Sequence, residues 1–413
     1  MTTKFPVFFG VTRDFDSTCI ERPAAEIDRR FEALLPVGTT RLAGKTVAVC
    51  VGSRGIASLP ELVRATIDNL RVRGANVFIV PTMGSHGGGT AEGQREVLRN
   101  LGITEESMGV EIHASMDTTD ICTLPNGPTV RFATDGLKAD HVVPVCRVKE
   151  HTMLGGEVQS GLCKMLVIGC GKHAGASEYH QHDIEKTLVP SAKAVIEHVP
   201  LLCGVAVVEN AYDKVCAVRV VRKEDFIETD KKLLRLAKNT LPRLPLDTLD
   251  ALLIDEIGKE ISGSGADVNV IGKWRRDGGP RVPDYKTIAL FGITPASHGN
   301  ATGIGNMDIM PRRILDILDY NATRINVLTS KTYRTARLPL HVEDDRAVLE
   351  AVLATVAHPE NITMARIRNT LALQRFWLTE SAVALLTPAM RCTVDATPQP
   401  CTFDSNGVLQ AFR

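Results

Sequence analysis

Two short apolar runs, separated by an amphipathic segment, open the regularly patterned part of the chain. Residues 46–51 and 76–81 are almost unbroken runs of apolar and β-branched side chains, which is typical of strands covered on both faces. Between the two runs, apolar side chains recur at helical spacing and predict a helix with one buried face, formed by Leu62, Val63, Ile67 and Leu70. Two strands joined by one helix should be parallel neighbours in a sheet.

The ends of the helices are marked as well. Ser58, followed by Pro60 and Glu61, predicts a capping box at the start of the first helix, and Gly74 is expected to end it. A second helix is expected over 90–101, directly after the second strand.

The same alternation continues through most of the chain. Further strands are predicted at 140–148, 202–208, 251–255, 287–292 and 324–328. Further helices are predicted at 184–198, 223–238, 311–318 and 343–356. Residues 240–248 contain two prolines before a new strand begins, which is typical of a linker. We therefore expect an α/β fold of two Rossmann-like domains, 1–244 and 245–413, with a ligand cleft between them.

Composition narrows the class of protein. The 413 residues carry 48 Lys and Arg against 48 Asp and Glu, and this neutral balance argues against a broad nucleic-acid surface. None of the ten cysteines forms a CxxC pair, so we expect buried thiols in a reducing compartment. The start of the chain lacks the pattern of a secretory signal, and the longest uncharged stretch, 287–307, contains Pro295, His298 and several glycines. We expect a cytoplasmic protein that does not enter the membrane.

Candidate chemistry follows three of the predicted strands. The strand at 46–51 is followed by Gly52-Ser-Arg-Gly, the strand at 76–81 by a glycine-rich loop, and the strand at 140–148 by Lys149-Glu-His. Ligands of open parallel sheets bind where the strands end, so these loops should share one edge.

The glycine-rich loop, residues 84–90, carries His86 and runs directly into a helix. Glycines allow close approach of the backbone to a ligand, and a helix N-terminus favours an anion. The His86 imidazole titrates near neutrality and is suited to proton transfer, although an exposed histidine in a flexible turn is an equally plain interpretation. Arg54, in the neighbouring loop, is suited to a bidentate contact with phosphate or carboxylate.

The densest group of titratable side chains lies between residues 151 and 182. Lys164 stands in an apolar run where desolvation would make it a nucleophile, or it is a lysine that reaches the surface from an element's end. His180 and His182 diverge on a helix and do not form a two-histidine metal motif. No P-loop, HExxH or GxSxG motif is present, and Gly169-Cys-Gly-Lys-His-Ala is only a weak dinucleotide signal.

Taken together, several segments resemble the nickel-dependent lactate racemase family, whose members use a nickel-pincer nucleotide. The resemblance covers roughly residues 45–330. It rests on Gly52-Ser-Arg-Gly, Met83-Gly-Ser-His-Gly-Gly-Gly-Thr-Ala-Glu-Gly-Gln, Lys149-Glu-His, Ser160-Gly-Leu-Cys-Lys, Gly171-Lys-His-Ala-Gly, Ile261-Ser-Gly-Ser-Gly-Ala-Asp-Val-Asn-Val-Ile-Gly and Ser297-His-Gly-Asn-Ala-Thr-Gly-Ile-Gly.

The resemblance implies a role for each matching residue. His86 and His151 would be the acid/base pair, Lys164 the covalent attachment point of the cofactor, and His180 the nickel ligand. Lys172 competes with Lys164 for the attachment, because the interval from His151 to Lys164 is longer than in the family. We expect the cofactor to be bound also by Ser53, Arg54, Gly87, Gly88 and Thr90, and the substrate by Arg275, His298 and Asn300.

The resemblance thus implies an isomerase: a racemase or epimerase of a 2-hydroxy acid that works by reversible hydride transfer, with a small-molecule substrate and separate cofactor maturation proteins as partners. Lactate itself is in doubt, because Ile271 and Gly272 replace the Tyr-Gln pair of lactate-racemising members. One alternative is a divalent-metal hydrolase or lyase that uses His86, His151 and His180 as ligands. Another is a non-catalytic protein that binds a nucleotide or a sugar acid.

Overall fold

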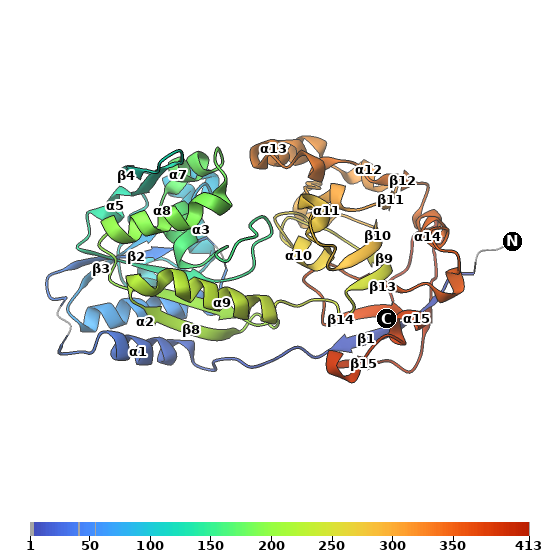
Figure 1. The fold of residues 1–413 in the computed structure, drawn as a ribbon, viewed down its shortest axis with the longest axis horizontal. Helices are drawn as coiled ribbons and strands as arrows, with labels where there is room; N and C mark the ends of the chain where they lie inside the picture. The colour runs from blue at the N-terminus through green and yellow to red at the C-terminus, as the bar shows by residue number, and fades with distance from the viewer. Residues whose placement is uncertain (1–3, 40–41, 54, 413) are drawn as a thin grey trace. The chain divides into compact units, whose positions relative to one another are not determined.

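The computed structural model describes residues 4–39, 42–53 and 55–412, and the chain forms two compact units (Figure 1). The N-terminal unit comprises Asp16–Leu241, and the C-terminal unit combines Pro242–Arg413 with Met1–Phe15. Both units contain parallel strands and flanking helices, so the expected α/β class is confirmed. The sequence analysis divided the chain after residue 244 and did not place the first fifteen residues in the C-terminal unit.

The N-terminal unit is built on a five-stranded sheet in the order β3-β2-β6-β7-β8, in which only β8 is antiparallel to its neighbour. Its strands are β2 (Thr46–Val51), β3 (Asn76–Pro81), β6 (His141–Arg147), β7 (Gly204–Glu209) and β8 (Val215–Val221), and a separate hairpin comprises β4 (Thr118–Thr123) and β5 (Thr129–Ala133). Its helices are α1 (Pro23–Leu34), α2 (Leu59–Val72), α3 (Ala91–Asn100), α4 (Glu105–Met108), α5 (Thr134–Leu137), α6 (Leu162–Lys164), α7 (Lys172–Tyr179), α8 (Ile184–His198) and α9 (Phe226–Thr240).

The unbroken apolar runs are covered on both faces, as predicted. Along β2, Val47 and Val49 pack into one core cluster, while Ala48 and Cys50 pack into the cluster on the opposite face. Side chains alternate between the faces of a strand, so a strand buried on both sides needs apolar residues at every position.

One local prediction was wrong in its mechanism. Ser58 precedes α2 as expected, but it has left-handed backbone angles (φ 58°), and its hydroxyl makes no capping hydrogen bond to the described residues of the helix. The Glu61 carboxylate instead accepts the backbone N–H of Ala24, at the start of α1, at 3.3 Å. The Glu61 carboxylate that the capping box required is therefore engaged in a tertiary contact with α1.

The C-terminal unit is built on a nine-stranded mixed sheet in the order β12-β11-β10-β9-β13-β14-β1-β15, with β16 also paired to β1. Its strands are β1 (Val7–Arg13), β9 (Thr248–Ile254), β10 (Asp284–Leu290), β11 (Ile309–Pro311), β12 (Leu340–Val342), β13 (Met364–Ile367), β14 (Arg375–Thr379), β15 (Cys392–Val394) and β16 (Gln399–Pro400). Its helices are α10 (Val268–Ile271), α11 (Trp274–Asp277), α12 (Ile314–Ile317), α13 (Tyr320–Ser330), α14 (Asp345–Leu353) and α15 (Glu380–Val383).

Two predicted elements of this unit were wrong. The strand expected at 324–328 lies inside α13, whose start is capped by the Asp319 side chain accepting the N–H of Ala322 at 3.0 Å. The helix expected over 311–318 is divided between the end of β11 and the short α12, because Pro311 pairs with Val342 in the sheet.

All ten cysteines are free thiols. Across the ranges that the structure describes, no helix combines the length and the apolar character needed to cross a membrane.

Candidate functional site

The carboxyl ends of β3, β2 and β6 lie next to one another, because these strands are adjacent and parallel in the sheet. The loops that follow them carry His86, Ser53 and His151. The Ser53 hydroxyl is hydrogen-bonded to Nδ1 of His86, so the first two loops are in direct contact. The shared edge predicted from the sequence is therefore present.

The His86 loop depends on its glycines. Gly84, Gly87, Gly88 and Gly89 all have positive φ angles between 59° and 66°, a region that other residues rarely adopt. A Cβ on Gly87 would lie 2.5 Å from the backbone carbon of Gly93 in α3, whereas one on Gly88 would meet nothing within 4 Å. The loop thus packs tightly against α3 on one side and leaves its backbone accessible at Gly88.

Thr90 begins the helix behind this loop. Its side chain accepts the backbone N–H of Gly93 at 3.1 Å, and this contact caps α3. The Thr90 hydroxyl also donates to the carbonyl of Gly87 at 3.1 Å. The structure therefore gives Thr90 a local capping role, whereas its contact with a cofactor stays a prediction.

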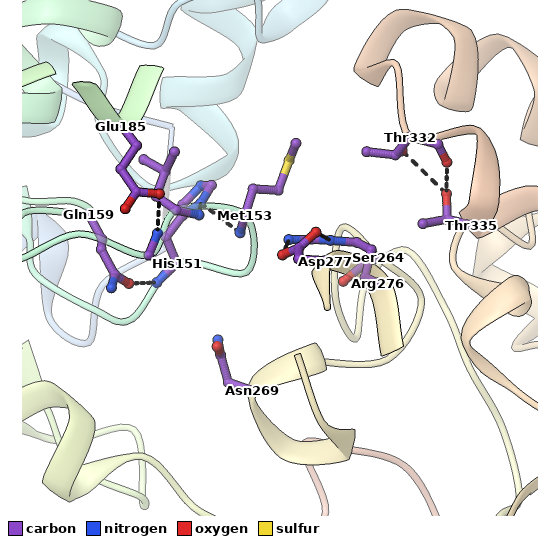
Figure 2. A network of polar contacts seen from close by, with 12 residues as sticks. His151, Met153, Gln159, Glu185, Ser264, Asn269, Arg276, Asp277, Thr332 and Thr335 are labelled. Carbon is purple, nitrogen blue, oxygen red and sulfur yellow. Dashed lines mark hydrogen bonds and ion pairs between the residues drawn. The ribbon is translucent and has the colours of Figure 1, made fainter. Parts of the chain in front are cut away.

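His151 is half-buried, and three hydrogen bonds fix its place (Figure 2). Its backbone N–H donates to Oε1 of Gln159 at 2.9 Å, and its ring Nδ1 accepts the N–H groups of Met153 at 3.0 Å and Leu154 at 3.3 Å. The Glu185 carboxylate holds the same loop by accepting the N–H of Gly155 at 3.1 Å. Because Nδ1 is an acceptor, Nε2 carries the proton of the neutral ring.

Lys164 ends α6 and is half-buried. The following residue, Met165, lies against the first two loops: its sulfur accepts the Thr82 hydroxyl at 3.1 Å, and its methyl carbon lies 3.0 Å from where a Cβ on Gly52 would be. The N–H of Gly84 also donates to the carbonyl of Gly169 at 3.3 Å. The Lys164 segment therefore packs beside the Ser53 and His86 loops.

Lys172 is the more deeply buried of the two candidate lysines, since Lys164 is half-buried. Lys172 is 1% exposed, and burial lowers its pKa. Its Nζ donates hydrogen bonds to the carbonyl of Pro81 and, at 3.4 Å, to Oε1 of Gln94. An amine enclosed in this way has no access to a large ligand, which argues against Lys172 as an attachment point, while attachment at Lys164 stays a prediction.

His180 follows the last residue of α7 and is exposed, and its backbone N–H donates to the carbonyl of Ala176 at 3.2 Å. His182 lies 3.5 Å from the Glu178 carboxylate. A role for His180 in binding nickel stays a prediction. Arg54 lies outside the described residues.

Among the residues described, no group of three or more His, Cys, Asp and Glu side chains lies close enough together to hold a metal ion. The hydrolase alternative, which needs three such ligands, therefore has no assembled ligand set in that part of the chain.

In the C-terminal unit, the guanidinium of Arg275 is already engaged. It pairs with Asp308 at 2.8 Å and donates to the backbone carbonyls of Tyr285, Lys286 and Asn306. With its side chain 6% exposed, Arg275 holds this part of the unit together, and these contacts argue against the expected role in binding substrate.

The other two expected substrate residues follow β10. His298 is exposed and has left-handed backbone angles (φ 46°), and Asn300 is half-buried, with its Oδ1 accepting the Thr302 hydroxyl at 2.8 Å. Both lie in the loop beyond the carboxyl end of a parallel strand, so their contact with a substrate stays a prediction.

Asp230 was missed by the sequence analysis. It is fully buried in α9, and its two carboxylate oxygens accept the N–H groups of Leu162 at 2.9 Å and Cys163 at 2.8 Å, at the start of α6. Burial raises the pKa of Asp230 to about 7, against the opposing effect of these hydrogen bonds. A Cβ on Gly161 would lie 2.2 Å from this carboxylate, so the turn that leads to Lys164 requires glycine.

Asn269 was also missed. It lies in α10, is 4% exposed, and its Nδ2 has no hydrogen-bond partner among the described residues (Figure 2). Buried amide donors are rarely left unpaired, so Asn269 is a candidate for contact with a ligand. The sequence feature that could have pointed to Asn269 is the nearby Asp267, two residues earlier, whose carboxylate accepts the Asn269 N–H at 2.9 Å.

Taken together, these features define a two-unit α/β protein that presents histidines and a lysine at the carboxyl edge of its N-terminal sheet. Residues 51–230 match a family model described as a domain of unknown function (DUF362). The fold is similar to the lactate racemase apoprotein from Thermoanaerobacterium thermosaccharolyticum, with a TM-score of 0.52 over 86% of this chain and 93% of that chain, at 15% sequence identity. A comparison with curated proteins gives no match.

Proposed function

We propose that this protein is a racemase or epimerase of a 2-hydroxy acid that works with a nickel-pincer nucleotide. The observation that carries the proposal is the convergence of the Ser53, His86 and Lys164 segments at one sheet edge, where the neighbouring strand leads into the His151 loop. A fold shared with a lactate racemase apoprotein supports it.

The residues present fit such a group. Lys164 is a half-buried amine at the site edge, whereas the Lys172 amine is enclosed. The backbone around Gly88 is open to a ligand. His86 lies in the same loop as Gly88, and Ser53, from the loop after β2, is hydrogen-bonded to His86. We propose that Lys164 holds the cofactor covalently, that His180 ligates its nickel, and that Ser53, Arg54, Gly87, Gly88 and Thr90 bind the rest. When bound, the group would supply a hydride acceptor.

The protein's own residues would then move the proton. His86 is suited to accept the hydroxyl proton of the substrate at Nε2, because Nδ1 can donate its own proton to Ser53. His151 presents a protonated Nε2, which is suited to donate a hydrogen bond to the substrate from the neighbouring loop. To return a proton to the substrate oxygen, His151 must first take up a second proton at Nδ1, in place of its contacts with the Met153 and Leu154 N–H groups. In the opposite direction the rings exchange roles: the His151 ring that is protonated at Nδ1 accepts the hydroxyl proton at Nε2, and a protonated His86 returns one.

The substrate is proposed to be a hydroxy acid other than lactate. Ile271 is buried, and Gly272 (φ 105°) has no room for a side chain: a Cβ would lie 2.7 Å from Nε1 of Trp274 and 2.8 Å from the carbonyl of Pro283. The Tyr-Gln pair of lactate-racemising members therefore has no equivalent here, and His298 and Asn300 are proposed to bind a more oxygenated acid.

The test begins with co-expression with nickel-pincer maturation proteins, which are proposed partners. Intact-mass and peptide analysis should locate an adduct at Lys164 with equimolar nickel, and not at Lys172. Single enantiomers of 2-hydroxy acids are then incubated in deuterium oxide. Inversion without deuterium at C2 supports hydride transfer, and inversion with deuterium indicates proton abstraction at carbon.

Two variants assign the acid/base roles. His86→Gln and His151→Gln should each lower turnover by at least about 100-fold, the usual contribution of a general acid or base, while retaining the cofactor. His198→Gln, at the far end of α8, is the matched control and should be unaffected. Cofactor-loaded protein that inverts none of a broad panel of acids would overturn the proposal and leave a binding protein as the better interpretation.

A further inference from the structure

Lys172 and Gln94 form a buried polar connection beneath the His86 loop. Gln94, in α3, is fully buried, and its Oε1 accepts a hydrogen bond from the Lys172 ammonium at 3.4 Å. Its Nε2 donates to the carbonyl of Gly84 at 2.9 Å and to the carbonyl of His86 at 3.4 Å. The Lys172 Nζ also donates to the carbonyl of Pro81, the last residue of β3.

The direction of this connection is fixed by chemistry. A lysine ammonium only donates hydrogen bonds, and a backbone carbonyl only accepts them. The Gln94 amide must therefore turn its oxygen toward Lys172 and its nitrogen toward the loop, because the opposite orientation would set donor against donor at Lys172 and acceptor against acceptor at the loop carbonyls. Lys172 in this way sets the orientation of Gln94, and Gln94 holds two carbonyls of the His86 loop.

The loop needs such an anchor. Four of its glycines have positive φ, and glycine has more backbone freedom to lose than any other residue. Lys172 itself has left-handed angles (φ 54°), which is rare for a residue with a side chain, and it begins α7 from that conformation. A methionine would fill the same space without the cost of burying an ammonium, but it would not orient Gln94.

We propose that Lys172 and Gln94 are positioning residues that hold the His86 loop in the conformation in which the His86 ring meets Ser53. The claim that Lys172 and Gln94 hold the loop depends only on their hydrogen bonds. The kinetic part rests on the proposed function, since it takes His86 as the acid/base residue.

Three variants separate this role from general stability. Gln94→Glu keeps an oxygen toward Lys172 but removes both donors to the loop, Gln94→Leu removes the connection, and Lys172→Met removes its first member. Ser191→Ala is the control, because its buried hydroxyl donates to the carbonyl of Thr187 at 2.7 Å and is not part of the connection between Lys172 and Gln94. Gln94→Glu is the decisive variant if Lys172→Met fails to fold, because its carboxylate satisfies the ammonium.

The first measurement is amide hydrogen exchange in the cofactor-free protein. Each of the three variants should raise exchange over residues 83–90 by at least about tenfold, the effect of losing a single buried hydrogen bond, with β2 and β6 unchanged. The double variant Lys172→Met/Gln94→Leu should exchange no faster than Gln94→Leu, because the two side chains act in series. Unchanged exchange over 83–90, a rise throughout the unit, or additive effects would overturn the proposal.

The second measurement uses cofactor-loaded protein. Gln94→Glu should lower kcat for inversion by about tenfold with KM within about twofold of the wild-type value, since the reacting group is misplaced while substrate contacts remain. A change in KM alone would contradict a positioning role. If the wild-type protein inverts no substrate, the proposed function fails, and the exchange measurement still decides whether Lys172 and Gln94 hold the loop.

Discussion

The Ser53 hydroxyl meets Nδ1 of His86, although the two residues are 33 positions apart and follow different strands. The contact fixes the plane of the imidazole and leaves Nε2 as its reactive nitrogen. Ser53→Ala should therefore lower kcat by about tenfold, equivalent to one hydrogen bond to the base, with little change in KM. The measurement is steady-state inversion of the best substrate by cofactor-loaded protein.

Ser85→Ala is the matched control, because Ser85 is an exposed residue of the same loop. It should retain wild-type kcat. If Ser53→Ala instead loses the cofactor during purification, the proposed contact of Ser53 with the cofactor matters more than its contact with His86.

The protonation of His151 is a second consequence of the hydrogen bonds. Two backbone N–H groups donate to its Nδ1, so the neutral ring should carry its proton on Nε2. Nitrogen-15 NMR of histidine-labelled protein above the titration range should report this tautomer. His198 provides an internal contrast, because its Nδ1 lies 2.8 Å from the carbonyl of Ala194 and should be protonated there. A His151 ring protonated at Nδ1 would contradict the arrangement.

The predictions that held concern patterns contained within one segment. The bounds of β2, β3 and α8 agree with the sequence analysis because apolar runs and helical spacing are local signals. The strand expected at 324–328 failed because Ile325 and Leu328 are exposed, at 59% and 52%, and their apolar character does not report burial there. The strand β1 was missed because its partner, β14, lies more than 360 residues further along the chain.

In the candidate site, too, the sequence predicted features carried by local patterns and missed those that depend on contacts between distant segments. His86, His151 and Ser53 were predicted because they follow strands whose parallel arrangement could be inferred. The burial of Lys172 and the contact between Asp230 and α6 depend on helices that pack across the unit, and no spacing in the sequence encodes them. The apolar run around Lys164 left open whether this lysine is desolvated or reaches the surface, and the tertiary structure leaves it half-buried while it encloses Lys172.

The close packing of the His86 loop on α3 predicts an unusual response to alanine. Gly93→Ala would place a Cβ 1.9 Å from the carbonyl oxygen of Gly87 and 2.8 Å from the Thr90 hydroxyl. Alanine normally stabilises a helix relative to glycine by up to about 1 kcal/mol, but here the backbone must move, and we expect a loss of about 1–3 kcal/mol. The free energy of unfolding in denaturant is the measurement.

Gly175→Ala, in α7, is the matched control for this variant. A Cβ there has its nearest neighbours at 3.8 and 3.9 Å, which is ordinary contact, so this change should stabilise the protein. Equal stability of the two variants would show that the loop yields to the added methyl group.

The buried Asp230 carboxyl should make stability depend on pH in the direction opposite to that of most carboxylates. Its pKa of about 7 in the folded protein lies above the usual value near 3.9, so the folded state binds more protons between about pH 4 and pH 7. The stabilisation is complete below about pH 4 and is lost as the pH rises through about 7, at up to about 1.4 kcal/mol per pH unit. Asp230→Asn should therefore flatten the profile of unfolding free energy from pH 4.5 to 8, measured in denaturant.

Asp213→Asn, at an exposed turn with left-handed angles that asparagine tolerates, should leave the wild-type slope intact. A difference profile between wild type and Asp230→Asn without slope in this range would mean that the carboxyl keeps an ordinary pKa beside α6.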